Sequence, residues 1–126
     1  MAMANKKVLV VDDSATVRQQ VALALSPAGF DVVEAADGVQ GLKAIEMHRD
    51  LALVICDVNM PHKNGIDMLS EAKAEGKNAN LPIVMLTTEG QPALIKKAKE
   101  AGACGWIVKP FKADRLVAAA EKLTSA

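Results

Sequence analysis

Aromatic residues are almost absent from this sequence, which contains no tyrosine, one tryptophan and two phenylalanines among its 126 residues. Hydrophobic residues nevertheless make up 51% of the chain, so a core is available and must be mostly aliphatic. A chain of this length is expected to form one domain. We therefore predict a single domain over residues 1–126, with a folded core over about residues 6–124.

The sequence also lacks an excess of charge of either sign, with 15 basic and 15 acidic side chains. A basic face for nucleic acid is therefore not expected. No hydrophobic run approaches the roughly 20 residues that span a bilayer, and residues 1–7 lack the pattern of a signal peptide. We expect a cytoplasmic protein that neither binds nucleic acid nor inserts into a membrane.

Cysteine is scarce as well, because Cys56 and Cys104 are the only two, too few for a disulfide framework. We predict that both are small buried residues of a cytosolic protein, and a redox pair is the weaker alternative. The fingerprints of dinucleotide and P-loop sites are missing too. No G-x-G-x-x-G follows the first predicted strand, and there is no Walker-type lysine.

Four short apolar segments and one that alternates weakly, residues 30–35, are separated by stretches of helical periodicity, and we predict that these five segments are β-strands. The segment 51–56 is apolar on both faces, which is typical of a buried strand in a parallel sheet. Connections between parallel strands are right-handed. The predicted fold class is therefore α/β: a doubly wound, five-stranded parallel sheet of the flavodoxin-like (βα)5 kind, with strand order 2-1-3-4-5. The predicted strands are residues 8–11, 30–35, 51–56, 82–86 and 106–108.

Several residues are expected to shape the turns after these strands. Ser14 and Asp37 are predicted N-caps of the helices that follow them. Gly38 and Gly41 should let their helix approach the sheet closely, and Gly65 offers a residue that tolerates positive φ after the turn that follows the third strand.

Polar side chains follow four of these strands, at the carboxyl ends where open α/β sheets bind ligands. Asp12 and Asp13 follow the first strand, Asp57 the third, Thr87 the fourth and Lys109 the fifth. Taken singly, each has an ordinary interpretation as an acidic cap, a turn hydroxyl or a solvated charge. Taken together they predict one site, because the predicted strand order brings these ends to one edge of the sheet.

Three neighbouring carboxylates repel one another, so this cluster is best explained by a cation among them. Ligands that are all oxygen, with room for water, suit Mg²⁺. The neighbouring Cys56 should point to the opposite face of its strand. Mg²⁺, a carboxylate, a hydroxyl and a lysine are the components of phosphoryl transfer. Asp57 would then be the nucleophile, and Lys109 and Thr87 would contact the phosphoryl oxygens.

Four short motifs carry these residues. They are Val10-Val11-Asp12-Asp13-Ser14, Asp57-Val58-Asn59-Met60-Pro61, Leu86-Thr87-Thr88-Glu89 and Val108-Lys109-Pro110-Phe111. Together they resemble the receiver domain of bacterial two-component response regulators, and most of all its single-domain chemotaxis type. The resemblance extends from about Lys6 to the C-terminus.

The resemblance implies that Asp57 is the phosphoacceptor and receives a phosphoryl group from a phosphohistidine of a sensor histidine kinase. It implies that Asp13 and Asp57, with the main-chain carbonyl of Asn59, ligate Mg²⁺, and that Asp12 acts partly through water. Lys109 would pair with the phosphoryl group, and the Lys109-Pro110 bond is expected to be cis.

The resemblance also implies how the signal is passed on. Thr87 would swing toward the phosphate and Trp106 would turn inward. This movement would change the face made by the helix that begins near Pro92, the strand 106–108 and the last helix, and so control binding of a downstream protein target. The expected setting is chemotaxis or motility. The expected protein is a monomer or weak dimer without an output domain, and not an enzyme, since it assists only its own phosphorylation and slow dephosphorylation.

Two positions depart from the family pattern. Residue 106 is Trp where Tyr or Phe is usual, so its inward rotation has a different cost. Thr88 stands where Ala or Gly is common and could narrow access to the site. Asn59, Thr88 and Glu89 are expected to tune the lifetime of the phosphate. On the helix before Trp106, Ile95 and Lys99 are expected to form part of the output surface together with Trp106. The plainer interpretation of Lys99 is that it belongs to a solvated face of that helix.

The residues also leave room for functions other than that of a receiver. A phosphorelay shuttle remains open within the same class. A Mg²⁺-dependent phosphatase of the haloacid-dehalogenase type would need a second Asp two residues after Asp57, where this chain has Asn59. A flavin carrier would need a Ser/Thr-rich phosphate loop after the first strand, where Asp12 and Asp13 would repel phosphate. The only histidines, His48 and His62, are predicted to be surface residues.

Overall fold

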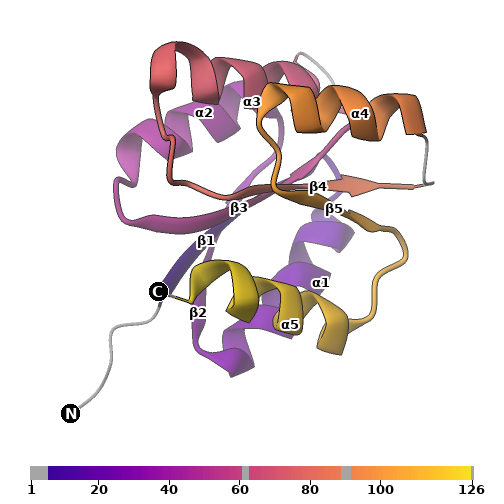
Figure 1. The fold of residues 1–126 in the computed structure, drawn as a ribbon. Helices are drawn as coiled ribbons and strands as arrows, with labels where there is room; N and C mark the ends of the chain where they lie inside the picture. Colours follow the sequence, from indigo (N-terminus) through magenta and orange to yellow (C-terminus); the bar gives the residue numbers. More distant parts are fainter. Residues whose placement is uncertain (1–5, 61–62, 89–91, 126) are drawn as a thin grey trace.

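The computed structural model describes residues 6–60, 63–88 and 92–125, in which strands and α-helices alternate along the chain (Figure 1). The strands are β1 (Lys6–Val11), β2 (Phe30–Ala35), β3 (Leu51–Asp57), β4 (Ile83–Thr87) and β5 (Gly105–Val108). The helices are α1 (Ala15–Leu25), α2 (Gly38–Met47), α3 (Gly65–Lys73), α4 (Pro92–Ala101) and α5 (Ala113–Thr124), with short 3₁₀ turns η1 (Ser26–Ala28) and η2 (Ala74–Gly76). None of the described helices is long and apolar enough to cross a membrane.

The strands form one parallel sheet in the order β2-β1-β3-β4-β5, which confirms the predicted fold class. The strand bounds differ from the predictions by up to two residues. β1 begins at Lys6 because Lys6 and Lys7 already pair with β2. β4 begins at Ile83, and the preceding Pro82 contributes only its carbonyl, which accepts a hydrogen bond from the N–H of Val54 at 2.9 Å.

Helices cover both faces of the sheet, with α1 and α5 on one side and α2, α3 and α4 on the other (Figure 1). Successive residues of β1 therefore alternate between two buried clusters, Leu9 and Val11 facing one and Val8 and Val10 the other. This two-sided burial explains why the apolar runs of the central strands β1, β3 and β4 do not alternate with polar residues. Phe30 is the only aromatic residue among the described core residues, so the core is aliphatic as predicted.

Side-chain caps begin three of the helices that follow the strands. The side chains of Ser14 and Asp37 accept hydrogen bonds from the N–H groups of Val17 and Gln40, as predicted. Asn64 caps α3 in the same way, and its side chain accepts a hydrogen bond from the N–H of Asp67. Each such cap stabilises its helix by about 1 kcal/mol, and together they keep the loops at the carboxyl edge short.

Gly65 is required for close packing rather than for a special backbone angle. Its backbone is not in the left-handed region, so the tolerance of positive φ expected of a glycine in this turn is not what the structure uses. A Cβ at this position would lie 2.0 Å from the carbonyl oxygen of Asp57, and the Gly65 N–H donates to the carbonyl of Val58 at 2.9 Å. Gly41 approaches β1 as predicted, since its Cβ would lie 3.0 Å from Val11, whereas Gly38 faces Lys63 and not the sheet.

Gly65→Ala should therefore lower the free energy of unfolding by about 3 kcal/mol, the upper range for overpacking a tight contact. The clash is with main chain, which has little room to move. Gly105→Ala is the control, because a Cβ there meets no atom within 4 Å. Urea unfolding of both variants tests this. Equal losses at the two positions would contradict the steric explanation.

The two cysteines differ in their surroundings. Cys56 is buried as predicted, and burial raises the pKa of its thiol well above the usual range. Cys104 is exposed, so its predicted burial is wrong. Cys104 lies just before the edge strand β5, where only one side of the chain is covered by β4; its N–H donates to the carbonyl of Ile83 at 2.9 Å. Both thiols are free, so the redox pair gains no support.

Candidate acidic site at the carboxyl edge of the sheet

Four charged side chains from three strand ends meet at the carboxyl edge of the sheet. Asp12, Asp13 and Asp57 each offer a carboxylate oxygen within 4.8 Å of the others. The Lys109 Nζ lies 2.9 Å from Asp12 Oδ2 and 3.2 Å from Asp57 Oδ1. The structure thus brings together the charged residues that the sequence predicted to converge.

The register of the sheet produces this juxtaposition. Val11 of β1 pairs with Cys56 of β3, so Asp12 and Asp57 follow side by side on adjacent strands. Thr87 of β4 pairs with Val108 of β5, which places Lys109 immediately beyond the sheet, where its N–H donates to the Thr87 carbonyl at 2.6 Å. Cys56 points away, with its Sγ 3.9 Å from Met68 Sδ, as predicted.

Asp12 is completely buried, and each of its polar groups has a partner. Its N–H donates to the carbonyl of Ala35 at 3.1 Å, and its Oδ1 accepts from the N–H of Ser14 at 2.8 Å. Its Oδ2 accepts from Lys109, and its main-chain carbonyl accepts from Arg18 Nη1 at 2.6 Å. Asp12 is therefore held more firmly than the exposed Asp13 beside it.

Burial makes the Asp57 carboxylate unusual. Asp57 is 6% exposed, and this burial raises the pKa of its carboxyl above the usual range, with the negative charge of Asp12 acting in the same direction. Lys109 opposes this rise without cancelling it. Partial burial acts to lower the pKa of Lys109, but its hydrogen bond to Asp12 and the charge of Asp57 outweigh that effect and raise it. Lys109 therefore stays protonated, while charged Asp57 remains short of positive partners.

The donor set fits a small divalent cation. Three carboxylates and one ammonium leave a net negative charge, and the described ligand atoms at the cluster are oxygens. Such oxygen sites with an open, exposed side suit Mg²⁺. Asn59 is exposed and follows β3 by two residues, on the loop beside Asp57.

Thr87 contributes a buried hydroxyl without a partner. It is 6% exposed at the end of β4, and within the described part of the chain its Oγ1 makes no hydrogen bond. A buried hydroxyl left unpaired is unfavourable by about 1–3 kcal/mol. A ligand oxygen at this edge of the sheet would remove that penalty.

Comparison with known proteins agrees with this geometry. Residues 8–121 match the family described as the response regulator receiver domain. The chain belongs to this family. It is 42% identical to the chemotaxis protein CheY1 of Helicobacter pylori over 106 residues, which are 83% of this chain and 86% of that protein. A CheY homolog of Campylobacter jejuni is also 42% identical, over 83% of this chain and 82% of its own.

Solved structures of receivers superpose closely on this one. Vibrio cholerae CheY4 has a TM-score of 0.89 at 38% identity, and the match covers 95% of this chain and 99% of that chain. CheY in the CheX-CheY-BeF3-Mg²⁺ complex of Borrelia burgdorferi has a TM-score of 0.88 at 27% identity, with 96% and 90% covered. The receiver resemblance expected from the four motifs is confirmed, and it leaves the phosphatase and flavin-carrier alternatives without support.

Trp106 points outward in this receiver and is 39% exposed on the edge strand β5. The ammonium of Lys99 in α4 lies 4.7 Å from the centroid of the Trp106 ring, a cation–π contact. Ile95, on the same helix, is half-buried. The predicted inward rotation of Trp106 would therefore have to break the contact with Lys99.

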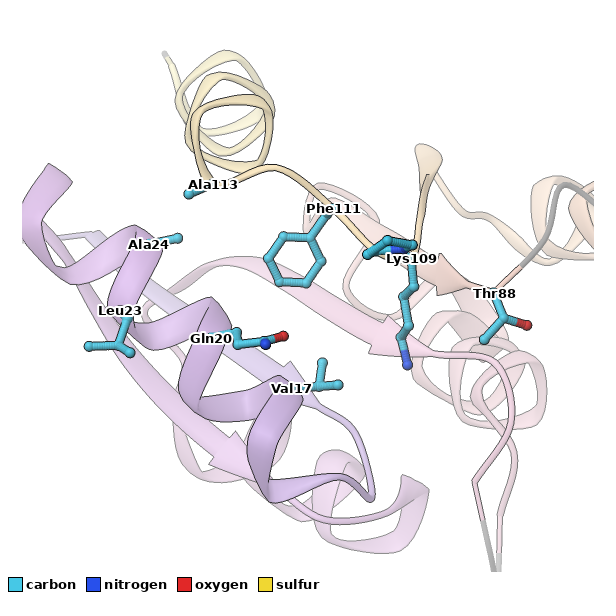
Figure 2. Close-up of a pocket in the computed structure, with 9 residues that line it drawn as sticks. Val17, Gln20, Leu23, Ala24, Thr88, Lys109, Phe111 and Ala113 are labelled. Atoms are coloured by element: carbon cyan, nitrogen blue, oxygen red, sulfur yellow. The ribbon is translucent and has the colours of Figure 1, made fainter.

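An apolar groove of about 620 Å³ opens beside Lys109 in this receiver, between α1 and the start of α5 (Figure 2). Figure 2 shows the Phe111 ring projecting toward α1, with Lys109 and Thr88 at the end of the groove nearest the carboxyl ends of the strands. The exposed Thr88 lines this end of the groove, and its expected effect on access to the phosphorylation site stays a prediction. The Lys109-Pro110 bond is cis, as expected from the resemblance.

Several residues singled out from the sequence lie outside the described residues or away from the acidic cluster. Glu89 and His62 lie outside the described residues, as does Pro61 of the second motif. His48 is half-buried, with its Nδ1 3.4 Å from Lys7 Nζ near the opposite edge of the receiver sheet. Arg18 contacts the site, and sequence reasoning did not single it out, because an arginine on the first turns of a helix carries no specific pattern.

Proposed function

We propose that this receiver is a phosphorylation-dependent binding switch in which Asp57 accepts a phosphoryl group from the phosphohistidine of a sensor histidine kinase. The observation that carries the proposal is the environment of Asp57. A buried carboxylate with a raised pKa lies beside a lysine and two further carboxylates, and an unpaired buried hydroxyl ends the adjacent strand β4. Each of these groups would gain a partner from a phosphoryl group and a cation.

The residues have distinct parts in this reaction. An Asp57 carboxylate oxygen attacks phosphorus, forming the new O–P bond as the P–N bond of the phosphohistidine breaks and the released imidazole nitrogen takes a proton. Lys109 and the Thr87 hydroxyl donate hydrogen bonds to the phosphoryl oxygens. Asp13, Asp57 and the Asn59 carbonyl would hold Mg²⁺, with Asp12 acting partly through water. When bound, Mg²⁺ neutralises charge on the phosphoryl oxygens.

The output would be read on the face formed by α4, β5 and α5. Thr87 moves toward the phosphate, Trp106 turns inward, and a downstream protein target binds the changed face. The similarity to chemotaxis proteins supports a pathway in chemotaxis or motility. The Borrelia complex with CheX, BeF3 and Mg²⁺ supports both the cofactor and a protein partner. Asn59, Thr88 and Glu89 would tune the lifetime of the phosphate.

Incubation of the purified chain with acetyl phosphate and Mg²⁺ tests the proposal. Intact-mass spectrometry should show one added phosphoryl group that requires Mg²⁺. Mg²⁺ alone should raise the free energy of unfolding by about 2.7 kcal/mol at 100 times its dissociation constant. Asp13→Asn should lose both effects, whereas Glu46→Gln, an exposed acid on α2, should keep them. Wild-type protein that gains neither phosphate nor stability would refute the proposal.

The Lys99–Trp106 contact makes a second measurement possible. Lys99→Met should remove about 0.5–1 kcal/mol that favours the outward ring, and so shift Trp106 about two- to fivefold toward the inward state. Trp106 is the only tryptophan, so acrylamide quenching of its fluorescence reports its exposure directly. Quenching should fall in Lys99→Met and stay unchanged in Lys96→Met, an exposed lysine on the same helix. Identical quenching in all three proteins would show that the contact does not hold the ring.

A further inference from the structure

We propose that Arg18 is a positioning residue of the acidic site, because its guanidinium fixes the peptide group that joins Asp12 to Asp13. This inference rests on the proposed Mg²⁺ site. Arg18 touches neither the cation nor the phosphoryl group in this scheme. It acts by setting where the Asp13 carboxylate lies.

The guanidinium of Arg18 has two partners, one in the loop directly after β1 and one on β2. Its Nη1 donates to the main-chain carbonyl of Asp12 at 2.6 Å, and its Nε donates to Glu34 Oε1 at 3.0 Å. Only 17% of the Arg18 side chain is exposed. Glu34 belongs to β2 and pairs with Val10 of β1, two residues before Asp12. The guanidinium therefore connects α1 to the sheet across the end of β1.

The peptide between Asp12 and Asp13 is the part of this loop that Arg18 determines. The Asp12 carboxylate is already fixed by Ser14 and Lys109, and the Asp12 N–H by Ala35. Among the described residues, no hydrogen bond holds the exposed Asp13 carboxylate, so its place depends on the backbone before it. A rotation of the 12–13 peptide would turn the Asp12 carbonyl away from Arg18 and carry Asp13 out of the cluster.

Electrostatics and the positioning role predict opposite changes in Mg²⁺ affinity when Arg18 is removed. Arg18 is a cation close to the acidic cluster, so by Coulomb's law alone its removal should strengthen Mg²⁺ binding. The positioning role predicts weaker binding. The nearby Glu34 carboxylate balances the Arg18 charge. The planar guanidinium can hold a carbonyl and a carboxylate together in fixed directions, which a single ammonium does less well.

Isothermal titration calorimetry of the full chain with MgCl₂ distinguishes the electrostatic effect of Arg18 from its positioning role. Arg18→Met should raise the Mg²⁺ dissociation constant at least about tenfold, as for other residues that orient metal ligands. Arg18→Lys, which keeps the charge without the planar fork, should raise it about threefold. Glu34→Gln keeps the bond to the Asp12 carbonyl and should have a smaller effect than Arg18→Met. Arg49→Met removes an equal charge from an exposed site and should bind like wild type.

Urea unfolding without metal, run on the same proteins, separates positioning from general stability. Unchanged or tighter Mg²⁺ binding by Arg18→Met overturns the inference, whatever its stability. If Arg18→Met does not fold, Arg18→Lys decides, and wild-type affinity in that variant overturns the inference. Wild-type protein that binds no Mg²⁺ refutes the proposed function itself. Equal binding by wild type and Arg18→Met removes only the positioning role.

Discussion

Asp57→Asn should take up no phosphoryl group from any donor, yet its metal-free form should be more stable than the wild type at pH 7. The first result follows because an amide oxygen cannot replace the carboxylate nucleophile. The second follows because Asp57 is buried beside Asp12, so its negative charge opposes folding even with Lys109 present. Loss of function together with a gain in stability is the signature of a residue kept for chemistry.

The pH dependence of stability is a second test of whether the Asp57 charge destabilises the metal-free fold. Burial raises the pKa of Asp57 in the folded state above its unfolded value. The folded state therefore binds the proton more strongly, and stability is lost as pH rises from the unfolded pKa, about 3.9, through the raised folded pKa. The amide introduced by Asp57→Asn does not titrate. The stability advantage of this variant should thus be largest above the folded pKa of Asp57 and vanish below about pH 3.9.

Thermal unfolding of both proteins across this pH range, with EDTA, measures the effect. Glu46→Gln serves as the matched control, since it also removes one carboxylate but from an exposed position. Adding Mg²⁺ should stabilise the wild type and reduce the difference, because the cation offsets the Asp57 charge. A lower melting temperature for Asp57→Asn at pH 7 without metal would mean that Lys109 already compensates the buried charge, contrary to our interpretation.

The convergence of Asp12, Asp57 and Lys109 could be predicted because it follows from topology. Once a run such as 51–56 is recognised as a two-sided buried strand, the parallel order places its end beside those of its neighbours. The convergence of the polar residues at those ends can then be predicted without knowing how the side chains pack. The N-caps Ser14 and Asp37 were equally local, because each depends on residues within three positions.

Other features depend on contacts between distant segments and could not be predicted. Arg18 donates a hydrogen bond to a main-chain carbonyl, and because every residue has a carbonyl the sequence does not indicate which one is the acceptor. Gly65 was assigned to a turn for its backbone freedom, whereas the structure needs it for the approach to Asp57. Cys104 is exposed because its segment borders an edge strand, a property of strand order and not of hydrophobicity. Each of these features is determined by another segment of the chain.

Lys109→Met should be the most destabilising substitution at the site, lowering the free energy of unfolding by about 3 kcal/mol at neutral pH. Lys109 is the partner of both buried carboxylates, Asp12 and Asp57. Removing one member of a buried ion pair costs about 3–5 kcal/mol, because it leaves charge uncompensated. The 17% exposure of the Lys109 side chain favours the lower end of this range. Lys43→Met, at an exposed position on α2, should change stability by less than about 0.5 kcal/mol.

The origin of this loss can be isolated by restoring charge balance in two ways. Mg²⁺ should stabilise Lys109→Met more than it stabilises the wild type, because the cation supplies the positive charge that the lysine no longer provides. The double variant Lys109→Met/Asp57→Asn should be more stable than Lys109→Met alone, since one of the two facing carboxylates is then neutral. Urea unfolding with and without Mg²⁺ measures both. If neither change recovers stability, Lys109 supports the fold through its packing, and charge compensation at Asp57 is not its contribution.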